Sequence, residues 1–152
     1  MPNLRRASSN RPQMPQVWSN ESPVNLWDKI KAIPGGAVHV AGWLGEGGRV
    51  VGPKDSQERA DCCNGDNPTG KRCPNNEPGT QLTGPVADAI KKTLEVKNKL
   101  RLRVRGEKML GTCTACGCVL RLKVHEPIDR VRRQITDEEY QKLPRWCWKI
   151  KA

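Results

Sequence analysis

Residues 113–118 have the sequence Cys-Thr-Ala-Cys-Gly-Cys, and this stretch decides the fold that the chain is expected to adopt. Two thiolates separated by two residues can bind one cation while the backbone between them turns tightly. Gly117 allows backbone N–H groups to approach the sulfurs. Apolar and basic residues alternate on both sides, at 100–105 and 120–125, which predicts two strands joined by the cysteine turn. The sequence therefore predicts a zinc-ribbon-like β-hairpin.

A tetrahedral zinc site needs four ligands, and the cysteine turn supplies two of them, Cys113 and Cys116. The expected second pair is Cys63 with Cys73, brought to the turn by a helix predicted at 85–98. Three further cysteines are alternative ligands: Cys62, Cys118 and Cys147. Cys62 would replace its neighbour Cys63 in the second pair. The other two would replace the second pair, pack as buried thiols or join a second metal site. Zinc is the expected cofactor.

Disulfides and catalysis are the competing interpretations of the seven cysteines. A disulfide framework is typical of secreted chains, but the count is odd and the N-terminus lacks the apolar region of a signal peptide. Redox Cys-x-x-Cys motifs usually open a helix after a strand, whereas this motif lies between two predicted strands. The sequence shows no carboxylate pair and no Ser/His/Asp set. We therefore expect a metal-binding protein that is not an enzyme.

Length and composition limit the fold class. A chain of 152 residues with 14 Gly and 12 Pro disfavours a TIM barrel or a doubly wound nucleotide-binding domain. No run of about 18 apolar residues exists, so no membrane-spanning helix is expected. The glycine-rich run at 45–48 is not followed by Lys-Ser/Thr, which disfavours a phosphate-binding loop. The expected class is a small α+β fold.

The first 58 residues are predicted to form an extended, irregular N-terminal arm used for docking. Residues 1–16 are basic and contain proline, and Ser22-Pro23 begins a short amphipathic helix that ends at Pro34. Residues 37–51 are typical of a β-hairpin or of a glycine-rich loop between two short strands.

Residues 59–152 are predicted to form the zinc-binding domain. The segment 52–84 is expected to be mostly loop, since Asn, Asp, Gly and Pro are frequent in it. Pro85 begins a helix that runs to about Asn98, with an apolar face made by Val86, Ile90 and Leu94. Thr136 is expected to cap a last short helix.

Positive charge is concentrated in the second half of the chain. The net charge is +11; residues 1–84 hold 10 Lys and Arg against 8 Asp and Glu, and residues 85–152 hold 17 against 8. Such a field attracts nucleic acid, since neutralised phosphates release counterions, but an acidic protein would also satisfy it. His125 is expected on the exposed side of its strand. The candidate polyanion-binding residues are the basic members of the two alternating stretches: Arg101, Arg103, Arg105, Arg121 and Lys123.

The pattern Cys-x-x-Cys-Gly-Cys-x-Leu-x-x-Lys, from Cys113 to Lys123, resembles small cysteine-rich proteins of tailed phages and prophages. In those proteins an upstream cysteine pair and a downstream cysteine near a tryptophan complete the set. Here residues 59–75 and Cys147-Trp148 are similar to these two features. The resemblance covers about residues 59–149. It implies a zinc-binding phage protein without a defined activity.

Two functional hypotheses follow. The first is a zinc-stabilised structural or assembly component of a phage particle, a minor virion protein that is made in the host cytoplasm. It would dock on neighbouring subunits within a multi-subunit assembly, near DNA and without a membrane partner. The alternative is a nucleic-acid-binding zinc ribbon that acts in transcription or replication through its basic strand faces.

Overall fold

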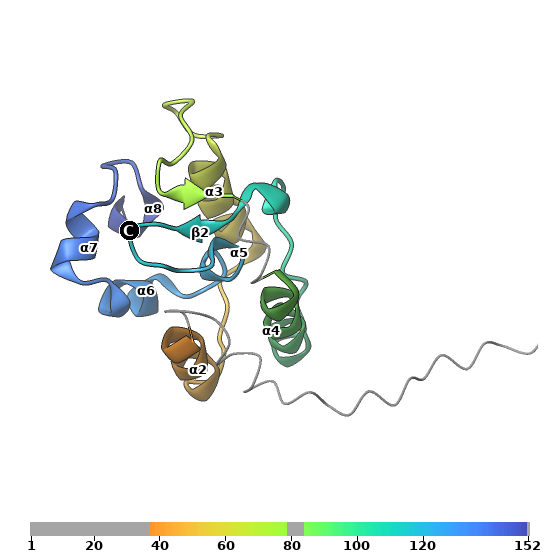
Figure 1. The fold of residues 1–152 in the computed structure, drawn as a ribbon. Helices are drawn as coiled ribbons and strands as arrows, with labels where there is room; N and C mark the ends of the chain where they lie inside the picture. Colours follow the sequence, from red (N-terminus) through yellow and green to blue (C-terminus); the bar gives the residue numbers. More distant parts are fainter. Residues whose placement is uncertain (1–36, 79–83, 152) are drawn as a thin grey trace, which may run out of the picture.

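The computed structural model describes residues 37–78 and 84–151. In this part of the chain, short helices surround one two-stranded antiparallel sheet, so the fold is a small mixed α+β fold (Figure 1). The arm predicted at 1–16 and the helix predicted at 22–33 lie outside the described residues. The described elements, in chain order, are α2 (Ala37–Gly45), α3 (Pro53–Asn64), β1 (Asn76–Glu77), α4 (Gly84–Asn98), the 3-10 helix η2 (Glu107–Met109), β2 (Thr112–Cys113), α5 (Leu120–Lys123), α6 (Ile128–Gln134), α7 (Asp137–Gln141) and α8 (Trp148–Lys151).

Two predicted helices are confirmed. Helix α4 begins and ends where the sequence predicts, and Ile90 and Leu94 on its apolar face are fully buried. Helix α7 has the predicted cap: the Thr136 hydroxyl accepts from the backbone N–H of Glu139, and the Glu139 carboxylate accepts from the backbone N–H of Thr136. The signal for α4 is its apolar spacing, and the signal for α7 is its capping residue; both can be recognised in the sequence.

Helix α3 corrects the prediction that 52–84 is mostly loop. The helix has Pro53 in its first turn and ends at Gly65, whose left-handed φ of 101° suits a residue without a side chain. Its buried side is made by Ser56, Ala60 and Cys63. These residues have helical spacing, but they are small or weakly apolar, so they give no hydrophobic periodicity in the sequence.

Helix α2 corrects the prediction of a hairpin or glycine-rich loop at 37–51. Trp43 is buried and its indole N–H donates to the carbonyl oxygen of Arg49 at 2.7 Å. The backbone N–H of Gly48 donates to the carbonyl of Trp43, which closes the end of the helix. The glycine-rich run is therefore a helix terminus rather than a connection between strands.

The prediction of two strands around the cysteine turn, at 100–105 and 120–125, is wrong. Burial alternates at 100–105, but the backbone N–H of Leu102 donates to the Glu95 side chain and that of Arg105 to the Gln57 side chain. Side chains of α4 and α3 thus replace a partner strand. The second stretch contains the short helix α5, in which Leu120 and Leu122 are both buried. Strand β2 pairs instead with β1, with Cys113 opposite Asn76.

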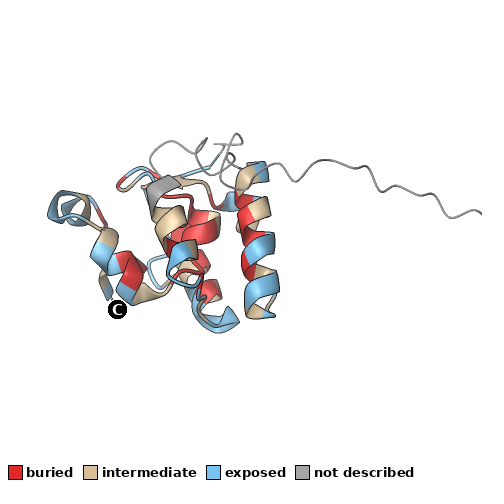
Figure 2. Ribbon diagram, turned by 90° about the horizontal axis from the view of Figure 1, so that it is seen from below, coloured by how far each residue is buried: buried red, intermediate tan, exposed pale blue. Residues whose placement is uncertain are grey.

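Figure 2 shows that buried residues lie along the helices on the sides that face the interior. These residues form two clusters. The apolar cluster lies between α2 and α4 and consists of Trp43, Ala87, Ile90, Leu94, Leu102, Val119 and Leu122. The thiol cluster consists of Ala60, Cys63, Val104, Leu110, Cys113, Ala115, Leu120, Val124, Val131, Leu143, Cys147 and Trp148. Helix α5 contributes to both clusters, and the domain boundary predicted between 58 and 59 falls inside α3.

No helix in residues 37–78 and 84–151 combines the length and the apolar character needed to cross a bilayer.

Candidate metal centre

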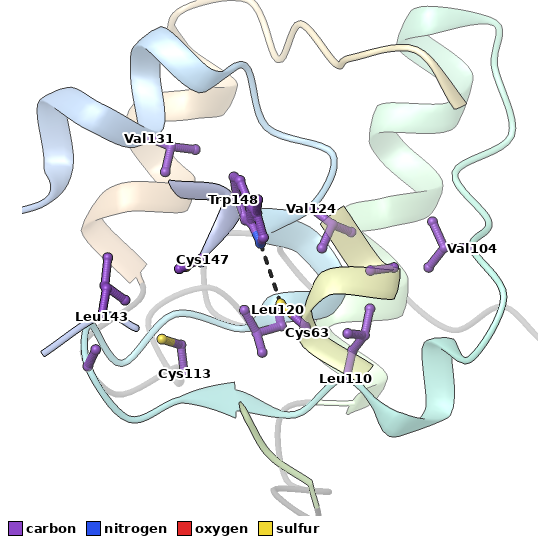
Figure 3. Close-up of a cluster of buried hydrophobic side chains, with 12 residues drawn as sticks. Cys63, Val104, Leu110, Cys113, Leu120, Val124, Val131, Leu143, Cys147 and Trp148 are labelled. Carbon is purple, nitrogen blue, oxygen red and sulfur yellow. Dashed lines mark hydrogen bonds between the residues drawn. The ribbon is translucent and has the colours of Figure 1, made fainter. Parts of the chain in front are cut away.

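Five segments carry the seven cysteines, and all seven are free thiols. Helix α3 carries Cys62 and Cys63, the loop before β1 carries Cys73, and Cys147 immediately precedes α8. The other three belong to β2 and the turn after it: Cys113, Cys116 and Cys118. Figure 3 shows Cys63, Cys113 and Cys147 within one buried group of side chains, and Cys62 and Cys116 pack against the same cluster. The fold therefore gathers thiols that are up to 85 positions apart in the chain, the separation of Cys62 and Cys147.

The cysteine turn has the tight backbone that the sequence predicts. The backbone N–H of Cys113 donates to the carbonyl of Cys118 at 2.9 Å, and that of Gly117 donates to the carbonyl of Cys113 at 2.7 Å. Gly117 has a φ of 64°, in the left-handed region that favours glycine. Thr112 and Val119 form an isolated antiparallel bridge at the base of the turn. The tight turn is thus present, with a single bridge at its base in place of the two long strands that were predicted.

Asn76 connects the cysteine-bearing segments and was missed by the sequence analysis. Its side-chain amide donates to the carbonyl oxygens of Cys63 at 3.2 Å and Met109 at 3.0 Å. Its side-chain oxygen accepts from the backbone N–H of Gly111 at 3.0 Å. One buried amide therefore fixes α3 against the segment that leads into β2. Its position three residues after Cys73 was the only signal available in the sequence.

Burial makes most of these thiols difficult to ionise. It raises the pKa of Cys62, Cys63 and Cys73, and it raises that of Cys147 to about 12. The pKa of Cys113 is raised first by its hydrogen bond with Cys116 and then by burial. Neighbouring sulfurs also disfavour one another's ionised forms. A set of thiols in this environment ionises readily only if a cation offsets the charge.

Cys118 is the exception. Its pKa is lowered to about 7, first by its hydrogen bond with Cys116, against the effect of burial, and then by the charges of Lys123 and Lys149. The anionic form of a thiol is therefore most favourable at the cysteine turn, close to the basic residues that surround it.

Lys149 is a buried cation beside the cysteine turn. Lys149 is 2% exposed, and its Nζ lies 3.1 Å from the Sγ of Cys116. Nζ also lies 5.8 Å from the centre of the Trp148 ring. Burial lowers the pKa of Lys149, but the sulfurs of the cysteine turn more than reverse this, so the pKa is raised. Within residues 37–78 and 84–151, Lys149 forms no ion pair with a carboxylate.

The predicted ligands are brought into one region but not into a closed site. Cys113 and Cys116 lie in the same turn, and the backbone N–H of Cys73 donates to the carbonyl of Cys63 at 3.2 Å. Among the described residues, no three or more His, Cys, Asp or Glu side chains are arranged so that they could hold a metal ion. The donor type, cysteine sulfur, is one that zinc prefers, although the arrangement of the sulfurs is not that of a closed site.

The basic residues predicted to bind polyanions do not form one face of a hairpin. Arg101 and Arg103 are exposed, and Arg105 is paired with Asp61 at 3.5 Å. The other two residues form intramolecular ion pairs: Arg121 with Asp88 at 2.7 Å at the surface, and Lys123 with Glu126 at 2.8 Å in the interior. The side chain of Lys123 is only 4% exposed, so it is unavailable to an external partner in this conformation.

His125 corrects the prediction of an exposed side chain. It is 1% exposed, and its Nδ1 lies 2.9 Å from the Ser56 hydroxyl. Burial lowers its pKa to about 4, and the positive charges of Lys91 and Arg59 add to this effect. The alternation in sequence placed His125 outside because it assumed a strand, whereas the chain has just left helix α5.

No family model matches the chain, and no similar protein is found among the curated proteins or the solved structures.

Proposed function

We propose that the protein is a zinc-stabilised structural component of a phage particle that docks on neighbouring subunits. Cys113 and Cys116 are the first two proposed ligands, and Cys63 with Cys73 are the second pair. Zinc would supply a cross-link between α3, the segment before β1 and the cysteine turn. The thiol side chains would have to approach one another beyond the positions that the structure gives them. Three cysteines remain as alternative ligands: Cys62, Cys118 and Cys147.

The buried ammonium group of Lys149 is the observation that carries the metal part of the proposal. A buried charge without a partner costs several kcal/mol. Here the partner is a sulfur, Cys116 Sγ at 3.1 Å, and not a carboxylate. Four thiolates around one Zn²⁺ have a net charge of about −2, and an adjacent ammonium group offsets part of it. A neutral thiol would give Lys149 much less compensation.

The placement of the basic residues favours the docking role over the nucleic-acid-binding role. Arg121 and Lys123 are held in intramolecular ion pairs, which leaves Arg101, Arg103 and Arg105 as the more exposed members. A shorter exposed stretch of guanidinium groups weakens the case for phosphate contacts along a hairpin. The resemblance to cysteine-rich phage proteins adds the particle as the setting.

Mass spectrometry of purified virions and assembly intermediates tests the docking role. We expect the protein in at least one of these fractions at a constant ratio to the major subunits. Its absence from both fractions would contradict the proposal. A DNA titration at low and high salt tests the alternative, since a phosphate-binding face predicts affinity that falls steeply with salt.

A further inference from the structure

A hollow of about 520 Å³ lies beside α3, between this helix, the loop at 66–69 and the C-terminal residues. We call it the α3 hollow. Trp146 and Trp148 form its aromatic part, and α3 and the loop at 66–69 form most of the remainder. None of its lining residues belongs to the cysteine turn, but Cys62 lines it, and Asp61 in its lining pairs with Arg105. It is therefore a second surface feature that borders the thiol cluster but does not include the cysteine turn beside Lys149.

The α3 hollow is acidic in a strongly basic chain. Its lining contains two cations, Arg59 and Lys151, and four carboxylate residues: Asp55, Glu58, Asp61 and Asp66. The Arg59 guanidinium is already engaged, since Nη1 donates to the carbonyl oxygen of Glu126 at 2.6 Å. Among the residues that the structure describes, neither Asp55 nor Asp66 forms an ion pair. Asp66 thus remains for an external cation, and Asp55 shares its charge with Arg59.

The aromatic lining favours a guanidinium group over other cations. Arg59 lies over the ring of Trp148, 4.8 Å from its centre, so the hollow already contains one stacked guanidinium. A planar guanidinium group can stack on tryptophan and donate to a carboxylate at the same time, whereas an ammonium group is a point charge. Phosphate groups would be repelled by the carboxylates, so nucleic acid does not suit this surface.

We propose that the α3 hollow docks an arginine-bearing peptide segment of a partner protein. The inference rests on the docking role proposed above and names the chemistry of the partner. Guanidinium groups of the segment would pair with Asp55 and Asp66 and pack beside Trp146. The proposal needs no metal at the hollow itself, so it can be tested separately from the zinc site.

Titration of the full-length, ¹⁵N-labelled protein with acetyl-Arg-Gly-Arg-Gly-Arg-amide tests the proposal by NMR. The indole N–H signal of Trp146, assigned with Trp146→Phe, is expected to shift with saturation. A peptide with citrulline in place of arginine keeps the shape and loses the charge, and it is expected to bind at least about tenfold more weakly. The double variant Asp55→Asn/Asp66→Asn should weaken arginine-peptide binding to a similar extent. Glu138→Gln, an exposed carboxylate on α7 outside the hollow, is the matched control and should leave the affinity unchanged.

Equal affinity for the arginine and citrulline peptides would overturn the inference. Unchanged binding by Asp55→Asn/Asp66→Asn would also overturn it. The same holds if the NMR signals that shift do not saturate and belong to residues near exposed carboxylates elsewhere on the protein. Zinc is measured in the same samples. A zinc-loaded protein that does not bind the peptide contradicts only this inference, and a zinc-free protein that binds it contradicts only the metal part of the proposed function.

Discussion

The apolar cluster and the thiol cluster lie in the same small fold but differ in chemistry. Between α2 and α4, the buried side chains are Trp43, Ile90, Leu94 and other apolar groups. Around Trp148, three of the buried residues are cysteines, and Lys149 lies buried beside the turn that carries Cys116. Burial of aliphatic groups stabilises the first cluster directly. The second also contains aliphatic groups, but its thiols and the adjacent buried charge contribute less, and the proposed zinc would add a cross-link there.

Loss of the metal is expected to have the largest effect, and to act unequally on the two clusters. Structural zinc contributes roughly 10–16 kcal/mol in small peptides, which exceeds most single-residue effects. Cys113→Ser or Cys116→Ser should therefore abolish zinc binding and lower amide exchange protection in α3 and α8 more than in α4. Cys118→Ser, outside the four proposed ligands, should be milder, and a strong effect would make Cys118 a ligand. Hydrogen exchange followed by mass spectrometry measures the protection of each helix. The prediction is contradicted if Cys113→Ser and Cys116→Ser lower protection in α3 and α8 no more than in α4.

Truncation in the apolar cluster is expected to have the next largest effect. Leu94 is fully buried, so Leu94→Ala should lower the free energy of unfolding by about 2–5 kcal/mol through lost burial and a cavity. The zinc content should stay the same because no cysteine belongs to this cluster. Urea denaturation with metal analysis checks both statements. Loss of zinc in this variant would show that the two clusters are not separable.

Acidification should act on the contact between α3 and the end of α5. The pKa of His125 is about 4 in the folded state and about 6.5 when unfolded, so the unfolded chain binds more protons between these values. The free energy of unfolding should fall by about 3 kcal/mol as pH decreases from 6.5 to 4. Lys91 and Arg59 face the ring and oppose its protonation.

His125→Gln removes this titration, so the pH dependence of the variant should be shallower than that of the wild type. His39→Gln, at the other histidine of the chain, is the control. Comparison of the slopes separates the histidine from the protonation of zinc ligands, which affects all three proteins. Parallel slopes for wild type and His125→Gln would refute the assignment.

Replacement of Lys149 is expected to have the smallest of these effects, confined to the thiol cluster. Lys149→Met keeps much of the apolar stem and removes the charge, and it should weaken zinc binding by about 10–100-fold. Lys149→Arg should restore most of the affinity because it keeps the positive charge. Competition with a chelator of known affinity gives both values. Identical affinities in the two variants would mean that the ammonium group does not balance the centre.

The sequence predicted those parts of the fold whose signals are local. Helix α4 follows from apolar spacing, the cap of α7 from Thr136, and the cysteine turn from its glycine. Helix α3 was not predictable in this way because its buried side consists of Ser56, Ala60 and Cys63. The strands predicted at 100–105 and 120–125 failed because alternation does not specify a partner, and side chains from α3 and α4 bond the first segment.

Only the part of the candidate site that lies within one short stretch of sequence could be predicted. The Cys113–Cys116 turn could be recognised from spacing, whereas Lys149 and Asn76 could not, since their roles come from contacts over 33 and 13 positions. Lys149 belongs to a basic C-terminal stretch that is typical of solvated residues. Its burial beside Cys116 depends on how α8 packs, which is a property of the complete fold.

Elemental analysis of the full-length protein, purified under reducing conditions without added metal, tests the central claim most directly. The account predicts about one zinc ion per chain, removed by strong chelators together with the protection of α3 and α8. After denaturation with chelator, all seven cysteines should react as free thiols. A metal-free protein whose melting curve is unchanged by chelator, with its cysteines oxidised in pairs, would contradict the account.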